Sequence, residues 1–199
     1  MTSPTPLFNH TAVVDFTRLL ELQGTPLVDT ILTSMFLRAI GRGVDHAIFH
    51  GPATDGAPLG VAATPDVSTQ DGSTFSIAKA AALLKAVEDG GADTSSVSFC
   101  MDPATAEKLR TRAKVSGGRR MILEDGRILD RPGYVSTGID AGTIFYGFFP
   151  DLVVLVREID LLFNPYTRGR QGVRQLLGFW YGDLFVQHSG YFALATVVS

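Results

Sequence analysis

The chain has 199 residues, of which 45% are hydrophobic and 19% charged, which is enough for one cored domain of ordinary size but too little for two large ones. A formal net charge of -3 supplies no positive excess for neutralising phosphates, which argues against sequence-independent nucleic-acid binding. No stretch approaches the roughly 20 uncharged apolar residues of a membrane-spanning helix, and the single Cys100 excludes an intrachain disulfide.

The cysteine and histidine content, the N-terminal sequence and the mean hydropathy predict a cytoplasmic protein without a zinc site that associates with other chains. One cysteine and four scattered histidines do not supply the usual ligands of a four-coordinate zinc site. The N-terminus lacks the basic start and apolar run of a secretory signal, so the cytoplasm is the expected compartment. A mean hydropathy of +0.19 and 13 phenylalanines predict apolar surface that is buried against another chain.

Residues 1–24 are expected to form an N-terminal arm or edge segment. Pro4 and Pro6 stand in a stretch without clear pattern, which is typical of a loose arm. Residues 12–21 begin with β-branched side chains and continue with apolar residues at helical spacing. We therefore expect a short strand that runs into a short helix and ends at Gly24.

A long helix is the clearest predicted element. Thr25 is a suitable N-cap, Pro26 suits the first turn, and Asp29 complements the positive end of the helix dipole. Apolar residues then recur with a period near 3.6 for about two dozen residues, which predicts a buried stripe on a helix about 36 Å long. The stripe consists of Leu27, Val28, Ile31, Leu32, Met35, Phe36, Ala39, Ile40, Val44, Ala47 and Ile48. Gly41 and Gly43 predict a bend or a close contact with another backbone.

A turn-rich loop and two further helices follow. The loop spans 51–60, and a second amphipathic helix is predicted at 76–89. A buried strand at 97–101 leads to a third helix at 104–113, for which Asp102 is the expected N-cap.

The last third of the chain is predicted to be rich in strands. The Asp-Gly pair at 125–126 predicts a hairpin that joins 121–123 to 127–129. Later strands are expected at 134–137, 143–148, 152–156, 159–163, 175–184 and 191–198. Because the helices precede most of the strands, we expect the α+β class.

Several motifs match one known family in their order. The long helix ends in GVDHAIFHG at 43–51 and leads to a loop that closes on PLGV at 58–61. A strand-to-helix step reads SFCMDPAT at 98–105, and the late segments include IFYGF at 144–148 and NPYT at 164–167. In this order and spacing, the chain from Phe16 to Val198 resembles the major capsid protein family of tailed bacteriophages, which has the Hong Kong 97-type fold.

The resemblance implies a structural phage or prophage capsid subunit, located in the virion or the host cytoplasm. It implies one capsid-like unit at 25–199, with a peripheral lobe at about 25–75 and 150–199 and an axial lobe at about 76–149. Family members normally carry an N-terminal arm and an extended hairpin loop before the long helix. Only residues 1–24 precede it here, so most of both is expected to be missing.

The resemblance also implies the partners. Copies of the same chain are expected to form pentamers, hexamers or a shell, and scaffold or other phage head proteins are further expected partners. No cofactor, specific nucleic-acid binding or membrane contact is expected, and no catalytic or metal-binding residue is predicted.

Charged residues are the candidates for contacts between subunits. Arg119 and Arg120 form the sharpest local positive charge, and the resemblance places them near the axial tip. There we expect them to contact Glu124 or Asp125 of a neighbouring subunit. Arg157 stands in a charged part of a predicted strand, where it either belongs to a solvated sheet face or fixes the register of neighbours.

The alternative from another class is a small α+β ligand-binding domain or metal-dependent enzyme that uses residues 46–60. His46 and His50 have the i, i+4 spacing of a metal-binding pair, but the glutamate that follows the first histidine in metalloproteases is absent. The loop at 51–60 follows a helix and lacks the Gly-Lys-Ser/Thr step, so a surface connection is favoured over a phosphate loop.

Nucleophilic catalysis has a weaker basis in the sequence. Asp45, His188, Ser189 and Cys100 could supply parts of a triad, but the Gly-x-Ser-x-Gly elbow is absent. Cys100 lies in an apolar strand and is expected to be a small buried residue. We therefore expect a protein that is not an enzyme.

Overall fold

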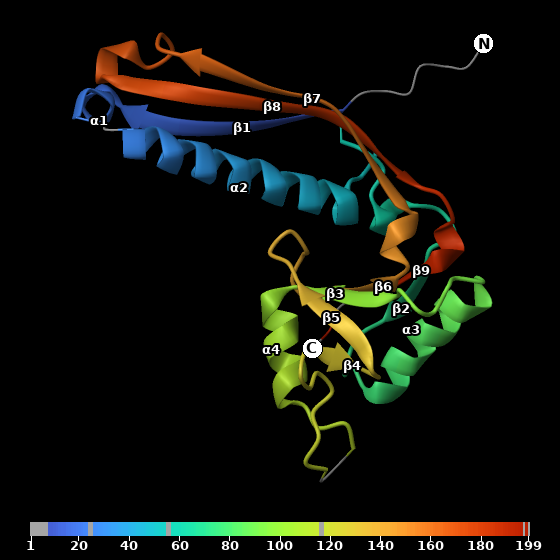
Figure 1. Ribbon diagram of the computed structural model, residues 1–199. Coiled ribbons are helices and arrows are strands. Elements are labelled where there is room, and N and C mark those ends of the chain that lie inside the picture. Colours follow the sequence, from blue (N-terminus) through green and yellow to red (C-terminus); the bar gives the residue numbers. More distant parts are fainter. Residues whose placement is uncertain (1–7, 24–25, 55–56, 116–117, 197, 199) are drawn as a thin grey trace, which may run out of the picture.

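The computed structural model describes residues 8–23, 26–54, 57–115, 118–196 and 198. They form a three-stranded sheet with a long helix along it, and a six-stranded sheet with two shorter helices. In Figure 1 the first sheet and the long helix lie above the second sheet, and the two units meet at one end of the long helix. The α+β class and the long helix are confirmed.

The upper unit is an antiparallel sheet in the order β1-β8-β7, with helix α2 along it. The bounds of these elements, with the short helix α1 that joins β1 to α2, are β1 Phe8–Thr17, α1 Arg18–Gln23, α2 Pro26–His50, β7 Leu152–Asn164 and β8 Val173–Val186. Side chains of β1 alternate between a shielded and an exposed face, as expected for a strand covered on one side. The expected strand-to-helix step is therefore confirmed, although the strand begins earlier, at Phe8.

A small core joins α2 to the upper sheet. It consists of Ala12, Phe36, Ile40 and Trp180. Gly178 on β8 lies directly under the Phe36 ring, so that a Cβ at this position would overlap the ring. The helix can therefore approach the sheet closely at this point.

The lower unit is a mixed sheet in the order β2-β9-β6-β3-β5-β4. Its strands and helices are β2 Ser68–Asp71, α3 Ile77–Asp89, β3 Ser98–Met101, α4 Pro103–Thr111, β4 Arg127–Ile128, β5 Arg131–Val135, β6 Ile144–Gly147 and β9 Phe192–Thr196. The β2/β9 and β3/β5 pairs are parallel, and the others are antiparallel. Single-turn 3-10 helices lie at Val61–Ala63, Phe149–Asp151, Gly169–Gln171 and Ser189–Tyr191.

Both helices of the lower unit begin at side-chain caps. The Ser76 hydroxyl accepts a hydrogen bond from the backbone N–H of Lys79 at the start of α3. Asp102 accepts from the backbone N–H groups of Ala104 and Thr105 at the start of α4. These local signals explain why both helices begin within one residue of the predicted positions.

The joint between the two units lies at the C-terminal end of α2. Phe49 of α2 packs in one apolar cluster with residues of the lower unit, namely Val61, Ile139, Phe145, Phe192 and Leu194. Beside this cluster, the Ser136 hydroxyl donates to the Asp45 carboxylate over 3.1 Å. The backbone N–H of Asp140 donates to Nε2 of His50 over 3.0 Å. The loop at 136–140 is thereby fixed to the helix.

The predicted hairpin is correct at its turn and wrong in its pairing. Asp125 and Gly126 have positive φ angles of 51° and 71°, as a tight turn requires. However, the backbone N–H groups of Ile122 and Leu123 donate to the carbonyls of Arg112, just after α4, and of Leu109 within it. The strand β4 therefore pairs with β5 across a second tight turn.

Other differences concern strands and the apolar stripe. The two strands expected at 152–156 and 159–163 are one strand, β7, with a bulge between Val156 and Glu158. Strand β2 was not expected at all. The stripe on α2 is only partly buried, because Phe36 is 1% exposed whereas Ile31 and Met35 are 46% and 52% exposed. Thr25, the expected cap, lies outside the described residues.

Candidate functional site

Strand β7 carries the longest run of uncovered apolar side chains. It is an edge strand, bonded to β8 on one side and, within the described residues, to no strand on the other. Eight of the large hydrophobic side chains that are more than a third exposed belong to it, namely Val153, Val154, Leu155, Val156, Ile159, Leu161, Leu162 and Phe163. A strand of this composition is typical of a position that is buried on both faces.

The register shows that these side chains lie on both faces of the sheet. Ile159, Leu161 and Phe163 pair with the three β8 residues that face α2, which are Trp180, Gly178 and Leu176. Leu162 pairs with Leu177 and therefore lies on the face away from α2. Among the described residues the helix packs mainly against β1 and β8, and the large apolar side chains on both faces of β7 are 37–53% exposed.

A second apolar surface lies where β1 and α1 meet α2. It is a groove lined by Val14, Phe16, Leu20, Ile31 and Met35, with Asp15 and Thr17 at its polar side. This explains why Ile31 and Met35 continue the apolar stripe of α2 without being buried. The sequence showed the stripe but could not show that part of it faces an open groove.

The tip of the β7–β8 hairpin is basic. The Arg168 guanidinium forms an ion pair of 2.7 Å with Asp15 on β1, and the Arg174 guanidinium lies over the Phe163 ring, 5.3 Å from its centroid. Tyr166 at the tip is 87% exposed. Arg174 meets Phe163 because β7 pairs with β8, and Arg168 meets Asp15 because β1 lies on the other side of β8.

The predicted contact residues fall in two separate places. Arg119, Arg120, Glu124 and Asp125 are exposed on the segment that connects α4 to β4. Glu124 already has a neighbour in its own chain, since Nζ of Lys114 lies 3.9 Å from its carboxylate. Arg157 is also exposed, but it lies in the upper sheet, at the bulge of β7.

The two histidines of the alternative hypothesis face an acidic residue. Nε2 of His46 and Nδ1 of His50 lie 3.4 and 3.6 Å from the Asp140 carboxylate. Nε2 of His50 accepts a backbone hydrogen bond, so this nitrogen carries no proton. Burial is the main cause that lowers the pKa of His50, and Asp140 opposes it. No cluster of potential metal ligands is found among the described residues.

The residues of the imagined triad enter different contacts. His188 binds Asp151, with 2.9 Å between Nδ1 and the carboxylate, whereas Asp45 accepts from Ser136. Cys100 is mostly shielded, and burial raises the pKa of its thiol to about 12. A thiol of this kind is a poor nucleophile at neutral pH.

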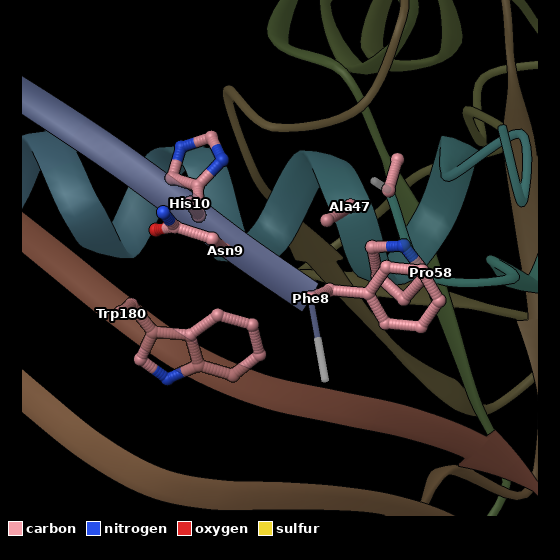
Figure 2. Close-up of a pocket in the computed structure, with 7 residues that line it drawn as sticks. Phe8, Asn9, His10, Ala47, Pro58 and Trp180 are labelled. Carbon is pink, nitrogen blue, oxygen red and sulfur yellow. The ribbon is translucent and has the colours of Figure 1, made fainter. Parts of the chain in front are cut away.

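A hollow opens where β1 begins, beside α2 and the loop that follows it. Figure 2 shows Phe8, His10, Ala47, Pro58 and Trp180 around it, and Asn9 and Ala57 complete its lining. Of these residues only His10 is titratable. The pKa of His10 is lowered by burial and further by His46. The lining offers apolar contact and one imidazole, without a second acid or base to act with it.

None of the described helices is both long enough and apolar enough to cross a membrane. The structure singles out four surfaces, which are the apolar strand β7, the groove beside α2, the basic hairpin tip and the charged α4–β4 segment.

Comparison with protein families gives a match to the phage capsid family over residues 4–197. None of the curated proteins that were compared with the chain matches it.

Solved structures of similar fold come from phages and from a GTA particle. A structure from Gordonia phage Cozz is 16% identical, has a TM-score of 0.69, and covers 97% of this chain and 70% of that one. The capsid of a native GTA particle is 16% identical at a TM-score of 0.68, with 98% and 73% covered. A structure from Mycobacterium phage Adephagia is 11% identical at a TM-score of 0.71, with 96% and 71% covered. The chain is thus shorter than each of these.

Proposed function

This chain belongs to the phage capsid family, and from that premise we propose that copies of it associate into pentamers, hexamers or a closed shell. It is a structural phage capsid subunit of the Hong Kong 97-type fold, and its place is the virion. The family match over residues 4–197 is the observation that carries the proposal. The uncovered apolar surface on β7 supports it, because such a surface is typical of an interface.

The association requires no catalysis. The family and the similar solved structures are those of capsid proteins, which build shells. In this chain, two residues of the triad considered above, Asp45 and His188, bind different partners. The function is therefore the repeated burial of complementary surfaces between identical subunits. Scaffold or other head proteins are further proposed partners, which the family suggests without naming them.

The two lobes of the proposal correspond to the two sheets. We assign α2 and the sheet β1-β8-β7 to the peripheral lobe, and α3, α4 and the six-stranded sheet to the axial lobe. The strand β1 joins the peripheral lobe by its pairing with β8, although it lies in the segment 1–24 that we expected to be separate. We assign β2 and β9 to the axial lobe because they bond to its sheet, although their sequence positions lie outside 76–149.

The charged α4–β4 segment is a proposed contact around the ring axis. Arg119 and Arg120 would face Glu124 or Asp125 of the next subunit, and exposure of all four supports this arrangement. Individual exposed ion pairs contribute little, so we expect Arg119→Ala to leave folding intact and to weaken ring formation modestly. Thermal melting and sizing of the variant test both parts. Unchanged ring formation would remove Arg119 from the interface.

Size-exclusion chromatography with light scattering, followed by negative-stain microscopy, tests the proposed function. We expect particles of ring or shell mass at micromolar concentrations. A protein that remains monomeric at all concentrations would contradict it. The competing metal-dependent function predicts a rise in melting temperature with zinc, and the capsid function predicts none.

A further inference from the structure

The face of the upper sheet that lies away from α2 carries a group of acidic and aromatic side chains. Glu158 pairs with Tyr181, and Asp160 pairs with Phe179, across the β7–β8 ladder, so these four residues share that face and form the acidic–aromatic patch. We propose that the patch binds the β7–β8 hairpin tip of a second copy, with Arg170 of the tip as the anchor. This inference rests on the proposed self-association and names one of its contacts.

The patch combines the two kinds of group that recognise a guanidinium. The Phe179 and Tyr181 rings are stacked, with 6.2 Å between their centroids, and both residues are half-buried. Glu158 and Asp160 are exposed beside them, and no described basic side chain forms an ion pair with either carboxylate. A guanidinium stacks on aromatic rings and binds a carboxylate through two parallel N–H groups, so this combination favours an arginine over a lysine.

Two leucines flank the acidic residues on the same face. Leu155 and Leu162 pair with β8 residues that lie an even number of positions from Tyr181, and they are 52% and 51% exposed. An exposed ion pair alone contributes little to binding. Apolar side chains at the border of the patch would exclude water from the pair, which strengthens it.

The hairpin tip, residues 165–172, is an ordered projection. Oδ1 of Asn164 accepts a hydrogen bond from the backbone N–H of Tyr166, and its Nδ2 donates to the Thr167 hydroxyl over 2.6 Å. Tyr166 is 87% exposed, and Arg170 is exposed as well. A tip that is ordered before binding loses little entropy on binding, and tyrosine and arginine are enriched among the residues that dominate interface energies.

Arg170 is the anchor because the other arginines of the tip region are already engaged. Arg168 forms its ion pair with Asp15, and Arg174 lies over the Phe163 ring. No described acidic side chain forms an ion pair with Arg170. Its charge is therefore available to a carboxylate of another copy.

The tip cannot reach the patch of its own copy. The ladder with β8 is unbroken from Asp160 to Asn164, so the tip begins about 13 Å beyond the patch and extends away from it. In Figure 1 the tip lies at the end of the upper sheet that is remote from the joint. Because tip and patch are different surfaces, the contact runs head to tail, and cyclic symmetry turns such a contact into a ring.

Crosslinking between two different variants tests the contact. Gln171→Cys places a thiol on the exposed tip, and Leu162→Cys places one beside the patch. We expect a short bis-maleimide linker to join the two variants in a mixture, and neither variant alone to give a covalent dimer. Glu107→Cys, at an exposed site on α4, replaces Leu162→Cys in the control mixture. The wild type controls for Cys100, which is mostly shielded.

Charge reversal tests the roles of Asp160 and Arg170. We expect Asp160→Lys alone and Arg170→Glu alone to weaken association by roughly tenfold or more, because each places like charges against each other. An equimolar mixture should recover, because the unchanged tip meets the unchanged patch and the two reversed charges meet each other. Arg110→Glu, exposed on α4, is the control that should neither weaken association nor rescue Asp160→Lys. Light scattering over a dilution series gives the association constants, and thermal melts check folding.

The outcomes separate this inference from the proposed function. If the wild type assembles but the mixed cysteine variants do not crosslink, or the mixed charge variants do not recover, the contact between tip and patch is wrong and the capsid function stands. If the wild type does not assemble but the cysteine variants crosslink selectively, the contact stands and the proposed function fails. If the wild type neither assembles nor gives the crosslink in its cysteine variants, both fail.

Discussion

Phe36 and Ile31 show that neighbouring residues of one apolar stripe have different roles. Phe36 is 1% exposed between α2 and the sheet, whereas Ile31 is 46% exposed and lines the groove beside α1. We expect Phe36→Ala to lower the free energy of unfolding by about 3–5 kcal/mol, since it leaves a cavity in a small core.

Ile31→Ala is the matched control on the same helix. Its expected cost is about 1 kcal/mol or less, because half of the side chain is already in contact with water. Urea denaturation of both variants measures the difference. Equal losses would mean that the groove is closed in solution and that Ile31 belongs to the core.

Two glycines of α2 differ in the space around them. A Cβ on Gly43 would overlap the imidazole of His10 on β1, whereas a Cβ on Gly41 would meet nothing. We expect Gly41→Ala to stabilise the protein by up to about 1 kcal/mol through helix propensity. Gly43→Ala should gain nothing or lose about 1 kcal/mol, because the ring must move. Thermal denaturation distinguishes them, and equal gains would show that His10 moves freely.

At the scale of the element, Asp102 joins a helix to a loop. One carboxylate oxygen caps α4 through two backbone N–H groups, and the other accepts from the backbone N–H of Gly142 over 3.2 Å. The side chain is buried. We expect Asp102→Ala to cost about 2–3 kcal/mol, more than a surface cap does, because buried donors lose their partner.

Ser76→Ala on α3 provides the comparison for that prediction. The Ser76 hydroxyl makes a single, longer cap bond of 3.4 Å, so its loss should cost about 1 kcal/mol. Chemical denaturation of both variants tests the ranking. A larger loss for Ser76→Ala would contradict the role given to Asp102.

The stability of the fold should respond to pH through His10 on β1 and His50 at the joint between the two units. Burial lowers the pKa values of His10 and His50 below the usual 6.5, so the unfolded chain binds protons more readily than the folded chain. Stability is therefore full above about pH 6.5 and falls as the pH drops below it towards the lowered values. Protonation of His50 also removes the acceptor for the N–H of Asp140.

His50→Gln isolates this contribution, because the amide oxygen can still accept that hydrogen bond. We expect the stability difference between wild type and variant to shrink or reverse between about pH 7.5 and about pH 5. Denaturation series at both pH values measure it. A constant difference would show that His50 does not titrate differently on folding.

The elements that the sequence predicted well are those with local signals. The helices α3 and α4 begin at Ser76 and Asp102 as expected, and the Asp125-Gly126 turn is where the dipeptide indicates. The pairing of β4 with β5 instead of 121–123 depends on bonds from Ile122 and Leu123 back to the end of α4 and the residue that follows it, which no local pattern reveals. Strand β2 is short and polar, and it exists because β9 lies beside it.

At the scale of the molecule, the order of motifs predicted the family, and the comparisons confirm it. The surfaces were harder to predict, because exposure depends on which side of a sheet the helix covers. An apolar run such as Leu152–Asn164 is consistent with a buried core strand, yet in this chain it is an open edge. Five charged residues were predicted as contacts between subunits, and one of them, Arg157, lies in β7. The exposed apolar side chains of β7 were not predicted as contacts.

Assembly should reduce the binding of an apolar dye. The half-exposed side chains of β7 should bind anilinonaphthalene sulfonate in dilute, unassembled protein. We expect the dye fluorescence per subunit to fall severalfold when light scattering shows particles. Leu155→Lys/Leu162→Lys, which removes apolar surface from one face, should start lower and change less. Fluorescence that does not change on assembly would mean that β7 stays uncovered.

Because the two units are joined at one end of α2, a small rotation at this joint produces a large displacement at the far end of the helix. The contacts through Phe49, Asp45 and His50 lie at one end of the helix, whereas the hairpin tip lies at the other end of the sheet. A helix of 25 residues is about 37 Å long, so a rotation of about 5° at the joint moves the far end by about 3 Å. The side chains of Phe49, Asp45 and His50 at the joint can therefore set the curvature of an assembly of these subunits.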